Sequence, residues 1–317
     1  MNSSNRFKIL VLDDIHPVFF KELCNSNCSF SKHPDWSYDQ ILLNIHKFDA
    51  VVVNSKTSVD AKLIQLGTKL KVIARPGSGM ENIDLVFAFN RGIQCFNSPE
   101  GNANAVAEHA LALLLTLSNR LHVALPQVKN KQWLRLENTG FELKNKTIGI
   151  VGFGHTGSAF AKLANALGMK VFAYDKYRYD FNCDYVEKVD LNKLLKYSDV
   201  ISLHLPLTAE TTSFFNTNLV RKLKKHSIII NTSRGKVMDL DALKAGFETQ
   251  KICAAALDVL PVEPLKSFIK ASPELFSWLK QNPDIILSPH IAGWSVEAKF
   301  LMAKILAERL KKSLIFH

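Results

Sequence analysis

Six short apolar runs recur between residues 147 and 287, separated by turns and amphipathic segments. Each run is apolar throughout instead of alternating with polar residues, which indicates a strand buried on both faces. Such strands belong to a parallel sheet whose faces are covered by the crossover helices that connect them. The pattern therefore predicts a doubly wound α/β fold. The predicted strands are residues 147–151, 170–174, 200–205, 227–230, 253–257 and 285–287.

The N-terminal third carries an α/β pattern of its own. Its predicted strands are residues 7–12, 50–53, 70–74 and 93–96, with helical stretches between them. A helical run over residues 103–123 follows, and a last helix is predicted at residues 295–314. Because 317 residues exceed the usual size of one hydrophobic core, two domains are expected. The predicted division is residues 1–98 with 291–317, interrupted by residues 99–290.

A glycine-rich turn follows the first strand of the second set. Gly152, Gly154 and Gly157 form a Gly-x-Gly-x-x-Gly pattern between that strand and an amphipathic segment. The glycines allow a tight turn and a close approach of backbone to a pyrophosphate, and the helix N-terminus offers N–H groups. Asp175 ends the next strand, about 20 residues on, where a carboxylate accepts from ribose hydroxyls and disfavours the extra phosphate of NADP. The alternative is an ordinary β-turn-helix with a surface aspartate, but the combination predicts an NAD site.

Three polar residues follow strand-like runs in the second half of the chain: Arg234, Glu263 and His290. The carboxyl ends of parallel strands meet at one edge of a sheet, so these side chains can converge although they are distant in sequence. A cation, a carboxylate and an imidazole together indicate acid–base chemistry on an anion. Taken singly, they could be a surface ion pair, a capping carboxylate before Pro264 and a buried core histidine.

The composition argues against several classes of function. The net charge of +11 would suit a nucleic-acid partner, but the basic residues are dispersed and the densest groups resemble solvated helix ends. Five scattered cysteines indicate reduced thiols and no metal site. No signal peptide is evident, and no apolar stretch is long enough to span a bilayer. We therefore predict a cytoplasmic enzyme with neither a nucleic-acid nor a membrane partner.

Several motifs occur in one order over nearly the whole chain. Beside the glycine turn they are residues 77–84 (GSGMENID), 102–109 (NANAVAEH), 202–208 (SLHLPLT), 231–235 (NTSRG), 258–264 (DVLPVEP) and 288–293 (SPHIAG). With these motifs the chain resembles the D-isomer-specific 2-hydroxyacid dehydrogenases. The resemblance implies a Rossmann NAD-binding domain inserted into a flavodoxin-like substrate domain. It also implies hydride transfer between NAD and a small 2-hydroxy or 2-oxo acid.

The resemblance also implies roles for individual residues. Arg234 would bind the substrate carboxylate, His290 would exchange a proton with the substrate oxygen, and Glu263 would orient the imidazole. Ser78 and Gly79 would offer backbone N–H groups to the substrate carboxylate, unless they form a plain glycine-rich turn. His204 could instead be a buried strand-end histidine, and His109 suits helix packing better than catalysis. The remaining cofactor-pocket residues implied are His155, Thr156, Pro206, Thr232, Asp258 and Gly293.

Fewer residues indicate which acid is the substrate. Phosphoglycerate enzymes of this family commonly have arginines in the loop that matches Asn54, whereas here Lys56 and Arg75 are the cations that could face a phosphate. Both could equally be solvated surface residues. We predict D-3-phosphoglycerate dehydrogenase, acting in the first step of serine biosynthesis, with hydroxypyruvate or glyoxylate reduction as the alternative. The motif departs at Glu81, where Asp is usual, and at His155, where Arg is common. A dinucleotide-sensing binding protein that resembles the C-terminal-binding-protein corepressors is the alternative of another class.

The resemblance further implies a homodimer formed through the nucleotide-binding domain. The apolar residues 110–117, with Trp133 nearby, are the predicted interface, and the alternative is that this helix is intramolecular core. No C-terminal regulatory domain of the kind found on some phosphoglycerate dehydrogenases is expected.

Overall fold

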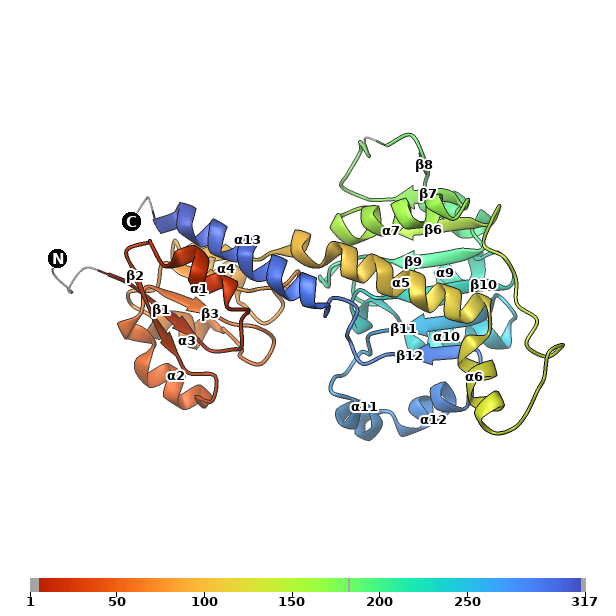
Figure 1. Ribbon diagram of the computed structural model, residues 1–317, viewed down its shortest axis with the longest axis horizontal. Helices are drawn as coiled ribbons and strands as arrows, with labels where there is room; N and C mark the ends of the chain where they lie inside the picture. Colours follow the sequence, from red (N-terminus) through yellow and green to blue (C-terminus); the bar gives the residue numbers. More distant parts are fainter. Residues whose placement is uncertain (1–5, 182, 315–317) are drawn as a thin grey trace. The chain divides into compact units, whose positions relative to one another are not determined.

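The computed structural model describes residues 6–181 and 183–314 and divides into two compact units. Unit 1 comprises Met1–Asn102 and Trp294–His317, and unit 2 comprises Ala103–Gly293. Unit 1 therefore contains both ends of the coloured chain in Figure 1, with the C-terminal helix packed against the N-terminal α1. The assignment of these units as substrate-binding and NAD-binding domains stays a prediction.

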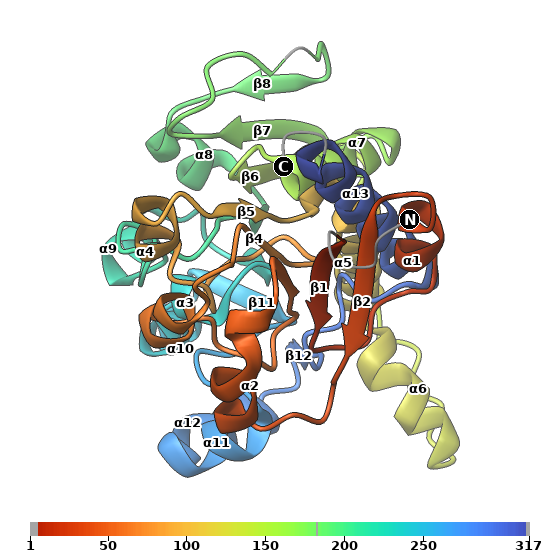
Figure 2. The ribbon, with the colours of Figure 1, turned by 90° about the vertical axis from the view of Figure 1, so that its left-hand side faces the viewer.

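Unit 1 is built on a parallel five-stranded sheet in the order β2-β1-β3-β4-β5 (Figure 2). This is the flavodoxin-like order, with helices on both faces. Ile9, Val11 and Val72 pack on one face against Leu306 and Leu310 of the last helix. The strands are β1 (Phe7–Val11), β2 (Cys28–Lys32), β3 (Ala50–Val52), β4 (Val72–Ala74) and β5 (Gln94–Phe96). The helices are α1 (Val18–Leu23), α2 (Tyr38–Asn44), η2 (Ile45–Lys47), α3 (Ala61–Leu66), α4 (Leu85–Asn90), η3 (Pro99–Asn102) and α13 (Val296–Leu314).

Unit 2 is built on a parallel seven-stranded sheet in the order β12-β11-β10-β9-β6-β7-β8. Strand order reverses between β6 and β9, as in a Rossmann fold, where the ligand crevice lies at the reversal. The strands are β6 (Thr147–Val151), β7 (Lys170–Tyr174), β8 (Val186–Lys188), β9 (Val200–Leu203), β10 (Ser227–Asn231), β11 (Ile252–Leu257) and β12 (Ile285–Leu287). The helices are α5 (Ala103–Ser118), α6 (Leu121–Lys129), α7 (His155–Ala166), α8 (Leu191–Tyr197), α9 (Thr217–Lys222), η4 (Gly235–Val237), α10 (Leu240–Glu248), α11 (Leu265–Ala271) and α12 (Pro273–Gln281).

Two hydrophobic layers cover the sheet of unit 2. On one face, Leu113, Leu114 and Leu117 of α5 pack with Phe160 of α7 against Ile150 and its neighbours. On the other face, α8, α9 and α10 contribute Leu194, Val220 and Leu243 to a second core. Burial of the central strands on both faces confirms the predicted doubly wound architecture.

The predicted strands all occur, with ends that differ by no more than two residues. Two edge strands, β2 and β8, were not predicted. Their residues are mostly half-buried or exposed, so they lack the continuous apolar signal of the central strands.

The prediction of one helix over residues 103–123 is wrong. The helix ends at Ser118, Arg120 adopts the left-handed conformation with φ of 52°, and α6 begins at Leu121. The Asn119 N–H still donates to the Leu115 carbonyl at 3.1 Å, but the Arg120 N–H donates to the Leu117 carbonyl at 3.1 Å, so the helix closes with a tighter 3₁₀-type turn.

Helix α13 packs closely on η3 in unit 1. A Cβ added at Gly101 would lie 2.6 Å from the Met302 backbone nitrogen and 2.7 Å from its Cα. We expect Gly101→Ala to lower the free energy of unfolding by about 1–3 kcal/mol, because backbone must move to admit the methyl group. Denaturant unfolding of the full chain would measure this. The control, Glu308→Ala on the exposed face of α13, should change stability by less than about 0.5 kcal/mol, and equal effects of the two variants would contradict this account.

Candidate active site

The glycine turn lies at the carboxyl end of β6, beside the point where strand order reverses. Gly152 has a φ of +92°, and a Cβ there would lie 2.5 Å from the His204 carbonyl oxygen. A Cβ at Gly157 would lie 2.0 Å from the Gly152 oxygen. Both positions therefore require glycine, whereas a Cβ at Gly154 would meet nothing within 4 Å. The open space at Gly154 fits a loop that a phosphate approaches closely.

Two further features of unit 2 fit a bound dinucleotide. Gly154 caps α7 without a side chain, so the first turn of that helix can offer its N–H groups to an anion. The Thr232 hydroxyl, just after β10, is buried and has no hydrogen-bond partner among the described residues. A buried hydroxyl without a partner is costly unless a ligand or water satisfies it. NAD would supply a nicotinamide that exchanges hydride at this sheet edge.

Asp175 holds the glycine turn from the end of β7. Its Oδ2 accepts from the Phe153 N–H at 2.8 Å, and its Oδ1 accepts from Tyr177 and Arg178 N–H groups at 2.9 and 3.0 Å. A carboxylate has about four acceptor sites, so these bonds leave room for a ribose hydroxyl. The predicted role of Asp175 at the ribose stays a prediction.

His204 is a buried strand-end histidine, the alternative considered from the sequence. Its ring lies 2.9 Å from Ser202 Oγ and 3.3 Å from Thr156 Oγ1. Burial lowers the pKa of His204 to about 3, so the ring is neutral near pH 7. It therefore links the end of β9 to the first turn of α7. Pro206 follows and its carbonyl accepts from Thr211, while His155 is exposed at the start of α7.

Glu263 and His290 form an ion-pair geometry at the ends of neighbouring strands β11 and β12. His290 Nδ1 lies 2.8 Å from Glu263 Oε2, and Glu263 Oε1 accepts from the Leu260 N–H at 3.3 Å. Burial alone would raise the pKa of Glu263, but the bond and charge of His290 and the Leu260 N–H outweigh it and hold that pKa below its usual range. The carboxylate is thus ionised near pH 7 and fixes one nitrogen of the imidazole. His290 itself has a φ of 57°, a strained conformation for a non-glycine residue.

Asp258 secures the loop that carries His290. Its buried carboxylate accepts from Ser288 Oγ at 2.6 Å and from the Ile291 and Ala292 N–H groups at 3.0 and 2.8 Å, while its backbone oxygen accepts from the His290 N–H at 2.8 Å. His109 Nε2 of α5 lies 3.5 Å from the same carboxylate. Burial would raise the pKa of Asp258, but the bonds from His109, Ser288, Ala292 and Ile291 hold it below its usual range. These contacts give Asp258 a positioning role, and its predicted place in the cofactor pocket stays untested.

Arg234 lies in a loop that is fixed from within. Asn231 Oδ1 accepts from the N–H and the hydroxyl of Ser233 at 3.0 and 2.8 Å, and Asn231 Nδ2 donates to the Arg234 carbonyl at 3.2 Å. The Arg234 guanidinium donates to the Ser233 oxygen at 2.7 Å. A Cβ at Gly235 would lie 2.0 Å from the Leu260 carbonyl, so this loop packs directly on the segment that leads to Glu263.

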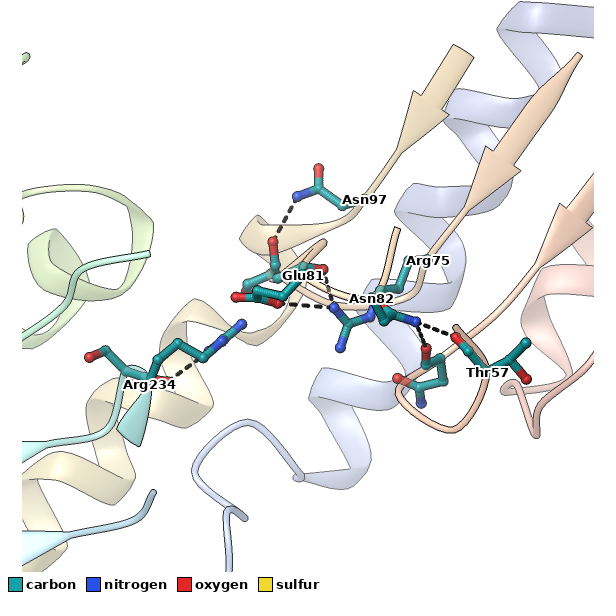
Figure 3. Close-up of polar contacts among 10 residues, drawn as sticks. Thr57, Arg75, Glu81, Asn82, Asn97 and Arg234 are labelled. Carbon is teal, nitrogen blue, oxygen red and sulfur yellow. Dashed lines mark hydrogen bonds and ion pairs between the residues drawn. The ribbon is translucent and has the colours of Figure 1, made fainter. Parts of the chain in front are cut away.

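The predicted substrate residues of unit 1 lie in the loops after β3 and β4 (Figure 3). Asn82 Nδ2 joins these loops internally, since it donates to the carbonyls of Asn54 and Thr57 at 2.7 and 2.6 Å. Arg75 donates to the Gly79 carbonyl at 2.5 Å and pairs with Glu81 at 3.3 Å, so it braces its own loop. Lys56 Nζ donates to the Pro34 carbonyl at 2.7 Å.

Ser78 is also tied within unit 1. Its hydroxyl donates to Asn102 Oδ1 at 2.7 Å, and its carbonyl accepts from Asn97 Nδ2 at 2.8 Å. Within the described chain, the backbone N–H groups of Ser78 and Gly79 have no protein acceptor, as a role in binding a carboxylate requires.

Sequence reasoning missed several residues that hold the loops in place. Asn82, Asn231 and Ser288 lie within the quoted motifs, but their roles depend on backbone groups that only the fold brings near. Asp13, just after β1, was not singled out, although its Oδ2 accepts from the Asn54 N–H at 2.5 Å. No group of three or more metal-binding side chains occurs among residues 6–181 and 183–314. Within the same ranges, the helices are too short or too polar to cross a bilayer.

The Asp258 contacts predict a stability that depends on pH. We expect Asp258→Asn to lower the free energy of unfolding by about 2–4 kcal/mol at pH 7, because an amide cannot accept all of these bonds. A lowered pKa means that the carboxylate contributes stability above its usual titration range and loses it as the pH falls, so the difference between variant and wild type should shrink below about pH 4. Urea unfolding at pH 7 and pH 4 would test this. A difference that grew at acid pH would contradict it.

Comparisons with known proteins identify the family of this chain. Residues 111–292 match the model of the D-isomer specific 2-hydroxyacid dehydrogenase, NAD binding domain. A hydroxypyruvate reductase of Thermotoga maritima is 38% identical over 276 residues, which cover 87% of this chain and 88% of that protein. A D-3-phosphoglycerate dehydrogenase of Synechocystis sp. is 37% identical over 97% of this chain, but the chain spans only 54% of that relative's length.

A solved structure has the same folds as unit 1 and unit 2 of this chain. The D-lactate dehydrogenase of Aquifex aeolicus, complexed with NAD and lactic acid, superposes with a TM-score of 0.84 at 26% identity, covering 98% of this chain and 96% of that one. The family model and these relatives identify NAD as the cofactor. The chain belongs to the D-isomer-specific 2-hydroxyacid dehydrogenase family.

Proposed function

We propose that this chain catalyses the NAD-dependent interconversion of small D-2-hydroxy acids and 2-oxo acids. The observation that carries the proposal is the pair formed by Glu263 and His290, whose facing atoms lie 2.8 Å apart. Because Glu263 engages Nδ1, the other ring nitrogen, Nε2, is the one left to exchange a proton with a substrate.

Each residue of the proposed site has a defined task. His290 would give a proton to the oxygen on C2 during reduction and take it back during oxidation. Glu263 would keep the imidazole in orientation and in one tautomer. Arg234 would bind the substrate carboxylate through its paired donors, since a guanidinium stays charged and matches planar oxygens.

We expect His290→Gln to lower kcat by about 10²–10⁴-fold while leaving thermal unfolding nearly unchanged, because the exposed ring supplies a proton but little packing. Steady-state oxidation of NADH with a 2-oxo acid would measure it. His46→Gln, at an exposed histidine of unit 1, is the matched control and should keep full activity. Wild-type turnover in His290→Gln would rule out the proposed acid–base role.

As the substrate, we propose D-3-phosphoglycerate first, because a D-3-phosphoglycerate dehydrogenase is 37% identical over 97% of this chain. Hydroxypyruvate or glyoxylate is the second candidate, because a hydroxypyruvate reductase matches at 38% and Lys56 and Arg75 make bonds within unit 1. A corepressor-like role without turnover is the remaining alternative. The proposed place of the activity is the cytoplasm, in serine biosynthesis if the phosphorylated acid is preferred.

Initial rates with 3-phosphohydroxypyruvate, hydroxypyruvate, glyoxylate and pyruvate, each with NADH, would separate these candidates. If the phosphorylated acid is the substrate, Lys56→Met should raise its KM by about tenfold and leave the KM for glyoxylate unchanged, because one charged contact is worth about 1.4 kcal/mol. Preference for an unphosphorylated acid would reject phosphoglycerate. Tight NADH binding without turnover on any acid would reject the enzyme proposal.

We also propose that the chain forms a homodimer through an apolar arm, defined as residues 121–141. The prediction that residues 110–117 form the interface is not supported, because Ala110, Leu113, Leu114 and Leu117 belong to the core of unit 2. In contrast, α6 has no buried residue, and Trp133 and Leu136 are 77% and 87% exposed. Figure 1 shows α6 and the following segment extending away from the sheet of unit 2.

We expect the wild-type chain to sediment at twice its mass of 35.6 kDa, because an apolar arm of this kind favours a partner surface. Replacing Trp133 and Leu136 together with serine should shift it to the monomer mass. The control, Leu43→Ser, changes an exposed leucine on α2 of unit 1 and should leave the dimer intact. A monomeric wild type, or a dimer that persists in the double variant, would contradict the proposal.

A further inference from the structure

Two loops of unit 2 meet over the carboxyl edge of β6. Because the sheet order is β9-β6-β7, the loops that follow β7 and β9 come from the two strands on either side of β6. Glu210, in the loop after β9, pairs with Lys176 and accepts from the Tyr177 hydroxyl. Two side chains that follow β7 thus converge on one carboxylate from another loop.

The loop that carries Glu210 is held by its own threonines. The Thr208 N–H donates to Thr211 Oγ1 at 2.8 Å, the Thr211 hydroxyl donates to the Pro206 carbonyl at 2.6 Å, and the Thr212 hydroxyl donates to the Thr208 carbonyl at 2.8 Å. These bonds close a compact turn around Glu210. The carboxylate is therefore presented from a defined position.

The loop after β7 carries cations next to Asp175. Arg178 donates to the Phe153 carbonyl at 2.9 Å and to the Asp180 carbonyl at 3.1 Å, and its guanidinium lies 5.7 Å from the centre of the Phe153 ring. Its donors are thus directed at the glycine turn and its own loop. Lys176 follows Asp175 directly, and the carboxylate that engages it is that of Glu210.

This position bears on the choice between NAD and NADP. The end of the second strand of a Rossmann fold is where the adenosine ribose is recognised, and a lysine there attracts a 2′-phosphate. In this chain, the Asp175 carboxylate accepts hydrogen bonds from three backbone N–H groups, which compensate part of its negative charge. We propose that Glu210 is a second determinant of NAD selection, because it neutralises Lys176, which would otherwise attract a 2′-phosphate at the ribose position. The inference rests on the NAD site and not on the proposed reaction.

The test measures binding of NADH and NADPH to the full chain by nucleotide fluorescence at low ionic strength. We expect Glu210→Gln to tighten NADPH binding by about fivefold and to leave NADH within about twofold, because an exposed charge pair is worth up to about 1 kcal/mol. Adding Lys176→Met to this variant should return NADPH affinity to the wild-type value. Raising the salt concentration should reduce the gain, since exposed charges are screened.

The matched control is Glu248→Gln, which removes an exposed carboxylate at the end of α10 and should leave both affinities unchanged. An unchanged ratio of NADPH to NADH affinity in Glu210→Gln would overturn the inference. A gain that persists in the double variant with Lys176→Met would also overturn it, because the released lysine would not be its source. This test measures nucleotide binding and not turnover. If the protein turned over no acid, that result would count against the proposed reaction, and the binding test of Glu210 could still be carried out.

Discussion

The hydrogen bonds of the buried Asp258 carboxylate hold the loop that carries the proposed catalytic residue His290. This carboxylate sits at the end of β11 and binds the hydroxyl and backbone groups of the segment that follows β12, on both sides of His290. The chain continues from Asp258 to Glu263, so the segment that carries Glu263 begins at the residue that holds the loop of His290. Each bond from an N–H or hydroxyl to this carboxylate compensates for its removal from water. The strained backbone of His290 persists because these contacts over-determine it.

Close backbone packing plays the same role for the other loops of unit 2. Gly152 allows the turn after β6 to pack on His204 at the end of β9, Gly157 allows α7 to pack on that turn, and Gly235 allows the Arg234 loop to pack on Leu260. Side chains then complete the fixation, as Asn231 does for Arg234 and Asp175 does for the glycine turn. Rigid loops at one sheet edge suit a site that must present a proton donor, a cation and a cofactor cradle in fixed relation.

The central architecture was predictable because its signal is strong and local. Strands buried on both faces must be apolar throughout, and the glycine turn between β6 and α7 has few alternatives. The edge strands β2 and β8 were not predicted because they bury little surface and therefore need no continuous apolar run. The break at Arg120 was not predicted because the left-handed conformation of a single residue leaves no mark on the apolar periodicity.

The sequence by itself determined the fold class, the family and the identity of the polar residues at the strand ends. Only the tertiary structure decided what each polar group does, because a carboxylate or guanidinium takes its role from partners that are distant in sequence. Asp258 binds groups more than 30 residues away, and Arg75 braces its own loop instead of standing open to a ligand. Likewise, the apolar residues of α5 became core and those of the arm did not, since burial depends on which surfaces the sheet offers to pack against.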